Sequence, residues 1–507
     1  MAALPVNGRS RWDRGMRRLM TIALTLALGA CAPQPAESDS LERFTGQTLT
    51  FGSCDGYATT AADEKLFAGQ ECARMLVPLD YDAPDGPTGE IAMLRVPARG
   101  ASLGPLLLNS GGPGGTGMNF AVQTAANLAG SPITERFDLV GFDPRGVGAS
   151  RPALDCFTDA QTDTAAEFIT TAGRYTEANT RAIAEGCATL SGGAQVLGAV
   201  GSRDTARDMD VLRAVLGQEK LSFLGQSYGT RIGALYAEQF PAHVRALVLD
   251  GAVDPQLGFA ERRLGTFAAF QTAFDALAAD CATKPDCPLG ADPTRVFQET
   301  VRPLVDRPLT GADGRKAGFN DVVGLVIALL YDSAAWPATV SIISGLRDGD
   351  PAPYFGVVDL LGSGAEGNFI DATIGINCID NERLTPAQAV ALRERIWAAA
   401  PFMDPGTGAE GARDSCEAWP VAPDPAFPYP AKVEGVAPTL TVSITGDTTT
   451  PHSGGISLAK TLGGGLLTVD GYGHTIVATG KNACVDAAVA AYLIDLRLPA
   501  ADARCTR

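Results

Sequence analysis

Short apolar runs recur along the 507-residue chain, and glycine, proline or aspartate bounds each of them. Continuous apolar runs of this length are typical of strands that are buried on both faces of a parallel sheet. Between several runs the apolar residues follow a helical period, most clearly over 203–216. Because alternating strands and helices form right-handed βαβ units, the pattern predicts a mainly parallel sheet with helices on both faces. The predicted strands are 106–108, 137–142, 221–224, 244–249, 440–444 and 466–469.

The alternation of strands and helices is interrupted in the middle of the chain. Residues 258–435 have the pattern of helices and proline-rich loops, with few strand signals, and they contain four of the cysteines. The strand–turn–helix pattern then returns. An insertion between two halves of one sheet explains this order better than two tandem domains. We therefore predict a core formed by 46–257 and 436–507, with an inserted, mostly helical cap at 258–435.

The composition is compatible with a large buried core and excludes one class of partner. Hydrophobic residues make up 46% of the chain and charged residues 19%, which is not the composition of a disordered protein. The formal net charge is -17. Because a protein of this charge repels phosphate backbones, we predict no nucleic-acid partner.

The N-terminus has the layout of a signal peptide. An arginine-rich stretch precedes an apolar run over 19–30, which is shorter than the roughly 20 residues that span a bilayer. The run ends in Leu28-Gly29-Ala30-Cys31, which resembles the lipobox of bacterial lipoproteins. The resemblance implies that the protein is exported and held in the cell envelope by a lipid on Cys31, its only expected membrane contact. The alternative is ordinary signal cleavage nearby and a secreted product. Residues 1–31 are thus a predicted signal segment, and 32–45 a tether.

The cysteines also favour export. Without Cys31, ten of the eleven cysteines remain, an even number that fits five disulfides in an oxidising compartment. The chain has no C-x-x-C motif and only three histidines, so we predict neither a redox motif nor a metal site. Pairing of nearest neighbours along the chain predicts the disulfides Cys54–Cys72, Cys156–Cys187, Cys281–Cys287, Cys378–Cys416 and Cys484–Cys505.

The strongest local signal is Gly225-Gln226-Ser227-Tyr228-Gly229, which matches the G-x-S-x-G nucleophile elbow. In such an elbow the serine lies on a strained turn between a strand and a helix, and the flanking glycines let the backbone close. The predicted strand 221–224 precedes the motif, and a helical period follows it. We therefore predict that Ser227 is a catalytic nucleophile; the alternative is a loop serine between two glycines.

A serine hydroxyl is a poor nucleophile without a general base. If the base is a histidine, it must be His243, His452 or His474. His474 lies in a glycine-flanked loop after the strand 466–469, and it comes last in the chain, as the order Ser, acid, His of the hydrolases requires. We predict His474 as the base; the alternative is a solvated loop histidine.

The third member of a triad is an acid that orients the imidazole. Asp447 follows the strand 440–444 and precedes His474, and it is the predicted acid. Its alternative role is that of a turn or helix cap. Asp470 competes, but it lies too near His474 along the chain to approach the ring easily from the far side.

Two backbone N–H groups are expected to bind the oxyanion. One belongs to Tyr228, the residue after the nucleophile. The other is expected from the loop 109–115, which follows the strand 106–108 and contains four glycines. Gly112 is the predicted donor, with Gly111 as the second choice. A phosphate-binding loop is the rival interpretation, but the segment has no G-K-[ST] and no G-x-G-x-x-G that opens a helix.

Together these motifs resemble those of the α/β-hydrolase peptidases related to proline iminopeptidase and bacterial tripeptidyl aminopeptidase. The resemblance covers most of 45–255 and 436–507, and more loosely the cap. Asn109-Ser110 and Thr448-Thr449-Thr450 depart from the usual pattern without removing a triad group. The shared motifs are the G-G-P-G loop at 111–114, D-x-R-G-x-G-x-S at 143–150, G-x-S-Y-G at 225–229, V-L-D-G at 248–251, G-D-x-x-x-P at 446–451 and G-x-G-H at 471–474.

The resemblance implies an α/β-hydrolase fold and the removal of short peptides from the N-terminus of peptide substrates, without a metal or organic cofactor. An aminopeptidase must bind the ammonium group of its substrate, which carboxylates do best. Asp380 and Glu382 in the cap are candidate anchors, and a solvated turn is the alternative. A carboxylesterase acting on lipid or small acyl esters would use the same triad. A non-catalytic cell-surface binding lipoprotein is a third possibility, but it predicts a degraded triad or oxyanion loop, and neither is visible.

Overall fold

The computed structural model describes residues 38–158, 175–361, 367–424, 429–430 and 433–507. The predicted signal segment with Cys31, and residues 32–37 of the predicted tether, lie outside these residues. Among the helices that are described, none is both long enough and apolar enough to cross a membrane. The sheet and the active-site elements belong to one compact unit, Ser40–Arg507.

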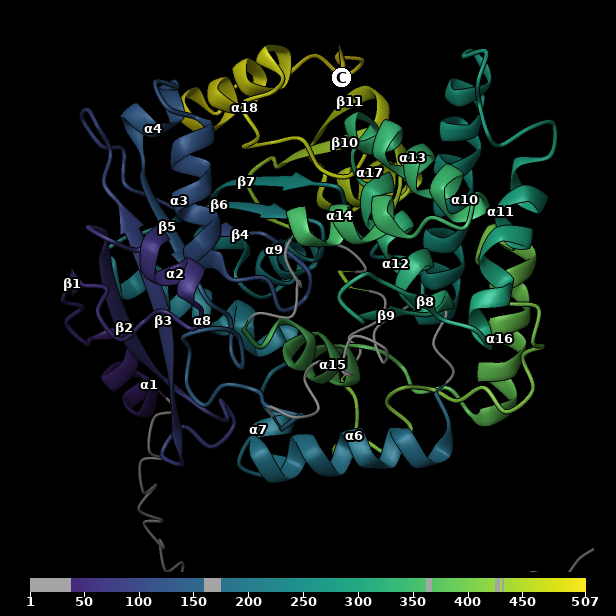
Figure 1. Cartoon of the computed structure of the whole chain (residues 1–507). Helices are drawn as coiled ribbons and strands as arrows, with labels where there is room; N and C mark the ends of the chain where they lie inside the picture. The colour runs from purple at the N-terminus through teal and green to yellow at the C-terminus, as the bar shows by residue number, and fades with distance from the viewer. Residues whose placement is uncertain (1–37, 159–174, 362–366, 425–428, 431–432) are drawn as a thin grey trace, which may run out of the picture. The chain divides into compact units, whose positions relative to one another are not determined.

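Within the described residues the main sheet has ten strands in the order β1-β2-β3-β5-β4-β6-β7-β10-β11-β12 (Figure 1). The pairs β1–β2, β2–β3 and β3–β5 are antiparallel, and every pair from β5 to β12 is parallel. The predicted α/β fold with a mainly parallel sheet is therefore confirmed. The strands are β1 Gly52–Ser53, β2 Glu71–Pro78, β3 Thr88–Val96, β4 Pro105–Asn109, β5 Asp138–Phe142, β6 Leu221–Gln226, β7 Val244–Asp250, β10 Leu440–Asp447, β11 Gly465–Gly473 and β12 Arg504–Thr506.

The six predicted strands are all present, as β4, β5, β6, β7, β10 and β11. The apolar pattern did not reveal β2 and β3, because charged residues such as Arg74 and Glu90 interrupt it. These two strands lie at the antiparallel edge, where one face of the sheet is partly open to solvent and Leu76 is 46% exposed.

Side chains of the parallel strands alternate between two apolar cores, one on each face of the sheet. Leu107 of β4 packs in one core with residues of helices α8 and α9, while Leu106 and Leu108 pack in the other with residues of α3 and α18. The predicted helix 203–216 is α8. Helices of the core region are α1 Ser38–Thr45, α2 Ala61–Leu66, α3 Gly117–Asn127, α4 Pro132–Arg136, α6 Glu177–Leu190, α7 Ala194–Gly198, α8 Ser202–Val215, α9 Tyr228–Gln239, α17 His452–Leu462 and α18 Ala483–Asp495.

The strand order reverses at β4, which has β5 on one side and β6 on the other. In open α/β sheets, ligands bind beyond the carboxyl ends of the strands at such a switch point. The carboxyl end of β4 leads into the glycine-rich loop, and the carboxyl end of β6 leads into Ser227. The topology therefore brings the predicted oxyanion loop and the predicted nucleophile to the same edge of the sheet.

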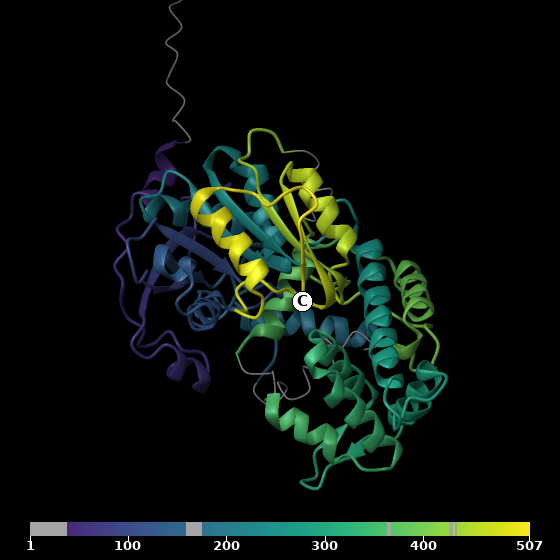
Figure 2. The ribbon, with the colours of Figure 1, turned by 90° about the horizontal axis from the view of Figure 1, so that it is seen from above.

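The segment between β7 and β10 is mostly helical, and most of it packs into an apolar cluster of its own. In Figures 1 and 2, helices α10 to α13 and α16 gather on the side away from strands β1 to β3. Helix α15 differs, because Ala372 and Ile376 pack in the core beside α9. The elements are α10 Phe259–Ala282, α11 Pro293–Val301, β8 Leu309–Thr310, β9 Lys316–Ala317, α12 Phe319–Leu330, α13 Trp336–Arg347, α14 Ala352–Leu361, α15 Phe369–Asp380 and α16 Pro386–Ala399.

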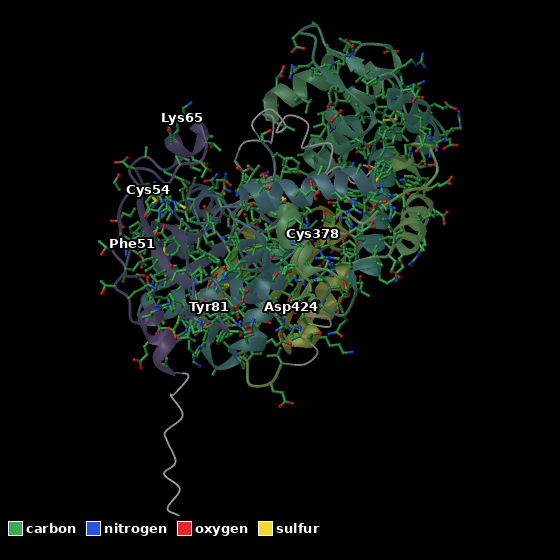
Figure 3. All side chains as sticks on the ribbon, turned by 90° about the horizontal axis from the view of Figure 1, so that it is seen from below. Phe51, Cys54, Lys65, Tyr81, Cys378 and Asp424 are labelled. Carbon is green, nitrogen blue, oxygen red and sulfur yellow. A yellow bond between two sulfur atoms is a disulfide. The ribbon has the colours of Figure 1, made fainter. Side chains whose placement is uncertain are left out.

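All five predicted disulfides are present among the described cysteines. Cys54–Cys72 lies at the antiparallel edge, and Figure 3 shows Cys54 there. Cys378–Cys416 joins the buried helix α15, where Figure 3 labels Cys378, to the loop that follows α16. The nearest-neighbour pairing is thus confirmed, and one of its bonds fixes a loop that borders the active-site pocket.

Candidate active site

Ser227 lies at the turn between β6 and α9, with a φ of 53°. This positive φ is uncommon for a residue with a side chain, and it is the geometry of a nucleophile elbow. A side-chain carbon on Gly225 would come within 2.5 Å of the Gly229 carbonyl oxygen, and one on Gly229 within 2.8 Å of Asn109 Oδ1. Both glycines of the motif are therefore required by close packing around the turn.

His474 contacts the acid that the sequence predicts for it. Its Nδ1 lies 2.9 Å from Asp447 Oδ1 and 3.1 Å from Oδ2. The backbone N–H groups of Thr449 and Thr450 donate to Asp447 Oδ1 at 2.9 and 2.8 Å. The carboxylate is thus held in place from one side while it orients the imidazole from the other.

The competing residues lie elsewhere. Asp470 pairs with Arg504, whose Nε donates to it at 2.9 Å. His243 Nδ1 is 2.7 Å from Asp210, and His452 Nδ1 is 2.9 Å from the Ser443 hydroxyl. Among the three histidines, only His474 is next to a carboxylate at the edge of the sheet where the elbow lies.

The environment of His474 favours its protonated form. Burial lowers the pKa of the imidazole, but the charge of Asp447 and its hydrogen bond raise it by more, so the pKa lies above its ordinary value. The edge of the Tyr331 ring packs against the imidazole at a centroid distance of 5.2 Å. A base that binds a proton more readily than usual suits the removal of a proton from a serine hydroxyl.

Asp250, which ends β7, was not predicted as part of the site. Its Oδ2 accepts the backbone N–H groups of Ile476 at 2.7 Å and Val477 at 2.8 Å, just after His474. Burial raises the pKa of Asp250 to about 6. The sequence signal that could have indicated Asp250 is its place in the V-L-D-G motif at the end of a strand. Nothing in the sequence showed that its carboxylate binds a loop more than 200 residues later.

The glycine-rich loop packs directly against the elbow. Gly111 and Gly112 have φ values of 90° and 112°, which favour glycine. A side-chain carbon on Gly111 would lie 2.4 Å from the Gln226 carbonyl oxygen and 3.1 Å from the Tyr228 nitrogen. The N–H of Gly111 already donates to Asn109 Oδ1 at 3.0 Å. Because this hydrogen bond engages the Gly111 N–H, Gly112 remains the proposed oxyanion donor.

Comparison with known proteins identifies the family of this chain. Family models match at residues 104–321 (alpha/beta hydrolase fold) and 401–505 (TAP-like protein). Serine protease Hip1 of Mycobacterium tuberculosis is 39% identical over 98% of this chain and 99% of its own length. Carboxylesterase B of the same organism is 40% identical over 97% and 99%, and tripeptidyl aminopeptidase of Streptomyces lividans 30% over 88% and 85%. The chain belongs to this family of α/β hydrolases. It is a serine hydrolase.

The two candidate amine anchors of the hydrolase lie in different surroundings. Asp380 is buried below the pocket: its Oδ1 accepts the Ser202 N–H at 2.9 Å, and its Oδ2 accepts the Ser202 hydroxyl and the Tyr228 hydroxyl, the latter at 3.1 Å. Arg231 lies 3.7 Å from the same carboxylate. Because these groups occupy the carboxylate and Asp380 is not among the residues that line the pocket, the expectation that Asp380 binds a substrate amine is corrected. Asp380 supports Tyr228 instead.

Glu382, by contrast, lines the pocket. Its Oε2 accepts the backbone N–H of Phe259, the first residue of α10, at 3.0 Å. No hydrogen bond to its Oε1 is present among the described residues, so this oxygen can accept one from a ligand. Of the two predicted anchors, only Glu382 has a place on the pocket surface.

The pocket of the hydrolase has a volume of about 750 Å³ and lies between the carboxyl edge of the sheet and the inserted helices. Ser227, Tyr228, Gly112 and Asp447 contribute to its wall on the sheet side, and α10 contributes much of the opposite wall. No cluster of metal-ligating side chains occurs in the described part of the chain. The arrangement provides a serine, a paired imidazole and backbone donors, which are the parts needed for acyl transfer.

Proposed function

We propose that this serine hydrolase is an exported peptidase that removes di- or tripeptides from the N-terminus of peptide substrates through an acyl-enzyme on Ser227. The observation that carries the proposal is the His474–Asp447 pair, in which Nδ1 and Oδ1 lie 2.9 Å apart, with Asp447 and Ser227 both lining a pocket of about 750 Å³. A pocket of that size has room for a short peptide. The names of two relatives, a serine protease and a tripeptidyl aminopeptidase, support peptides as the substrate class.

In the proposed mechanism, His474 takes the proton of Ser227 while Oγ attacks the substrate carbonyl carbon. The N–H groups of Tyr228 and Gly112 stabilise the oxyanion that forms. His474 then gives the proton to the leaving amine as the carbon–nitrogen bond breaks. In the second half, His474 deprotonates a water molecule, which attacks the acyl-enzyme and releases the short peptide with a new carboxyl group.

Release of peptides from one end requires a group that recognises that end. Glu382 is the proposed anchor for the substrate ammonium, because it lines the pocket and its backbone contact uses only one carboxylate oxygen. A charge-assisted hydrogen bond from the substrate ammonium group to the free Glu382 oxygen would hold the N-terminus of the substrate at a fixed distance from Ser227. The cap would then exclude longer N-terminal extensions.

Export is part of the proposal. The arginine-rich start, the apolar run and Cys31 support a signal segment, with lipid attachment at Cys31 and release as the two possible outcomes. Five disulfides in the described residues support an oxidising compartment. The intact mass of the protein from a lipidating host distinguishes the two outcomes, because an acylated Cys31 adds the mass of the lipid.

A carboxylesterase is the second candidate, because a relative with 40% identity carries that name. The same nucleophile, base and oxyanion donors hydrolyse esters, so the fold does not separate the two activities. The binding-lipoprotein interpretation predicts a degraded triad, whereas Ser227, Asp447 and His474 are all present in the sequence.

Turnover of paired substrates tests the proposal. Purified protein is given tripeptide chromogenic amides with a free or an acetylated N-terminus, and simple acyl esters in parallel. We expect fast cleavage of the free-amine peptide, little of the acetylated one, and a loss on the order of 10⁶ in kcat for Ser227→Ala. Cleavage of esters alone would contradict the peptidase proposal and favour the esterase.

A further inference from the structure

The pocket wall formed by the inserted helices is rich in arginine. Four guanidinium groups line the pocket, those of Arg231, Arg262, Arg263 and Arg393. The described carboxylates on the pocket wall are Asp254, Glu382, Asp414 and Asp447. The equal numbers suggest a neutral pocket, but the contacts of the individual groups show that the charges are not all paired.

The carboxylates are engaged with groups other than these arginines. Asp414 accepts the N–H groups of Leu384 at 2.6 Å and Cys416 at 2.8 Å. Asp254 accepts the Ser457 hydroxyl at 2.7 Å and the Gln256 N–H at 2.9 Å. Asp447 is hydrogen-bonded to His474. Among the described residues, no salt bridge joins Glu382 to a cation.

Two of the four arginines are held by buried or neutral partners. Arg231 donates to the Asp380 carbonyl at 2.6 Å and lies over the Tyr429 ring at 4.3 Å. Arg262 donates to Asn381 Oδ1 and, at 3.3 Å, to the Leu257 carbonyl. Burial lowers the pKa of Arg262, so its charge is poorly solvated where it stands.

Arg263, on the first turns of α10, has no such partner. In the described part of the chain it forms no salt bridge and no hydrogen bond, and its guanidinium lies 4.9 Å from the centre of the Phe267 ring. Burial, and then the nearby charge of Arg393, lower the pKa of Arg263 to about 10. A partly buried cation beside another cation is unfavourable unless an anion joins them.

Arg263 is close to the catalytic groups. Arg263 and Tyr331 line the same pocket as Ser227 and Asp447. The ring of Tyr331 in turn packs against His474, with the centroids 5.2 Å apart. Because Arg263 and Ser227 line the same pocket, a molecule bound at Ser227 can extend to the Arg263 guanidinium.

We propose that Arg263 is the centre of a subsite that binds a carboxylate of the substrate, and that this hydrolase prefers substrates with an acidic group near the scissile bond. A guanidinium presents a planar fork that matches a carboxylate with two parallel hydrogen bonds. The inference rests on the proposed function for its peptide substrates. The carboxylate can belong to an acidic side chain or to the free C-terminus of a short peptide, and the two sources are separated below.

The test uses the intact protein and two sets of short alanine-based peptides, with cleavage followed by mass spectrometry. In the first set the C-terminus is amidated and each position in turn carries Glu or Gln. In the second set all side chains are neutral and the C-terminus is free or amidated. We expect kcat/KM for the acidic member to exceed that for its neutral partner by roughly tenfold or more in one set, as a charged hydrogen bond would give.

Substitution of Arg263 tests whether this residue causes the preference for the acidic substrate. In Arg263→Gln we expect the ratio of kcat/KM between the acidic and the neutral member to fall to near one, because activity on the acidic member alone is lost. Arg263→Lys is expected to keep part of the preference. Arg395→Gln is the matched control, because Arg395 is a half-exposed arginine on α16 that pairs with Glu261 at 2.9 Å on the outer surface. Thermal unfolding of each variant shows that it is folded. Equal rates for both members of every pair, or a preference that survives Arg263→Gln, would overturn the subsite.

Ester substrates separate this inference from the proposed function. If no peptide is cleaved, the peptidase proposal fails, and the subsite is then tested with the 4-nitrophenyl monoester of glutaric acid against the matching ester of glutaramic acid. A preference for the acid that Arg263→Gln removes would support the carboxylate subsite in an esterase. Equal rates on both esters would overturn it.

Discussion

The backbone N–H of Ser227 donates a hydrogen bond of 2.8 Å to the backbone carbonyl of Asp250. The carboxylate of the same Asp250 binds the N–H groups of Ile476 and Val477, two and three residues after His474. One residue at the end of β7 therefore connects the nucleophile elbow on one side with the base loop on the other. We infer that the relative positions of Ser227 and His474 depend on this residue, although it is no member of the proposed triad.

Asp250→Ala is expected to lower both activity and stability. It leaves two buried N–H groups without an acceptor, which costs about 2 kcal/mol or more in the free energy of unfolding. Displacement of the base loop is expected to lower kcat roughly tenfold to a hundredfold. Asp250→Asn keeps an acceptor oxygen and is expected to retain most of the activity and most of the stability. Chemical denaturation and steady-state kinetics measure the two effects; equal behaviour of the Ala and Asn variants would contradict this role.

The pH dependence of the hydrolase follows from the His474–Asp447 pair. The proposed base His474 can accept a proton only when it is neutral, and the charge of Asp447 raises its pKa above the ordinary value despite burial. The acid limb of kcat/KM is therefore expected to have its midpoint above pH 6.5, with activity lost as the pH falls through it. Asp447→Asn is expected to lower kcat by about 10³ to 10⁴ and to move the limb to lower pH. A limb that stays in place in that variant would argue against Asp447 as the partner.

The two carboxylates after α15 are expected to respond differently to substitution. Glu382→Gln removes the charge from the proposed ammonium anchor, so KM for free-amine peptides should rise roughly tenfold while simple esters are hydrolysed as before. Asp380→Asn weakens the buried network with Ser202 and Tyr228, so peptides and esters should both be affected to a similar degree. Kinetics on the two substrate types checks this contrast; an unchanged KM for free-amine peptides in Glu382→Gln would remove the anchor.

The Cys378–Cys416 disulfide is expected to matter for the pocket as well as for stability. It closes a loop of 38 residues and fixes the segment that carries Asp414 on the pocket wall. Replacement of both cysteines by alanine should lower the free energy of unfolding by about 2–4 kcal/mol. The temperature at which activity is lost should fall with it. Double replacement of Cys281 and Cys287, which close a six-residue separation away from the pocket, is the comparison and should have the smaller effect.

Much of the fold was readable from the sequence because the parallel strands are buried on both faces. Runs such as 106–108 and 466–469 are apolar throughout, and the motifs follow their carboxyl ends. The antiparallel strands were missed because Arg74 and Glu90 break their apolar pattern. Local motifs predicted Ser227, Asp447 and His474 as a triad, since each lies at or directly after the carboxyl end of a strand.

The parts of the site that depend on distant contacts were not readable in this way. Asp380 was interpreted as a ligand group, yet its partners Ser202 and Tyr228 lie 178 and 152 residues away along the chain. Arg262 and Arg263 look like the solvated face of a helix, and only the packing of α10 over the pocket turns them inward. The sequence of an amphipathic helix does not show whether its charged face will line a pocket or face solvent.

The central claim is that Ser227 forms the acyl-enzyme with His474 as its base. The most direct measurement is the intact mass of the protein after reaction with a fluorophosphonate, followed by peptide mapping of the adduct. We predict one adduct per chain on the peptide that contains Ser227, its absence in Ser227→Ala, and much slower labelling in His474→Ala. An adduct on another residue, or labelling that persists unchanged in Ser227→Ala, would contradict the account.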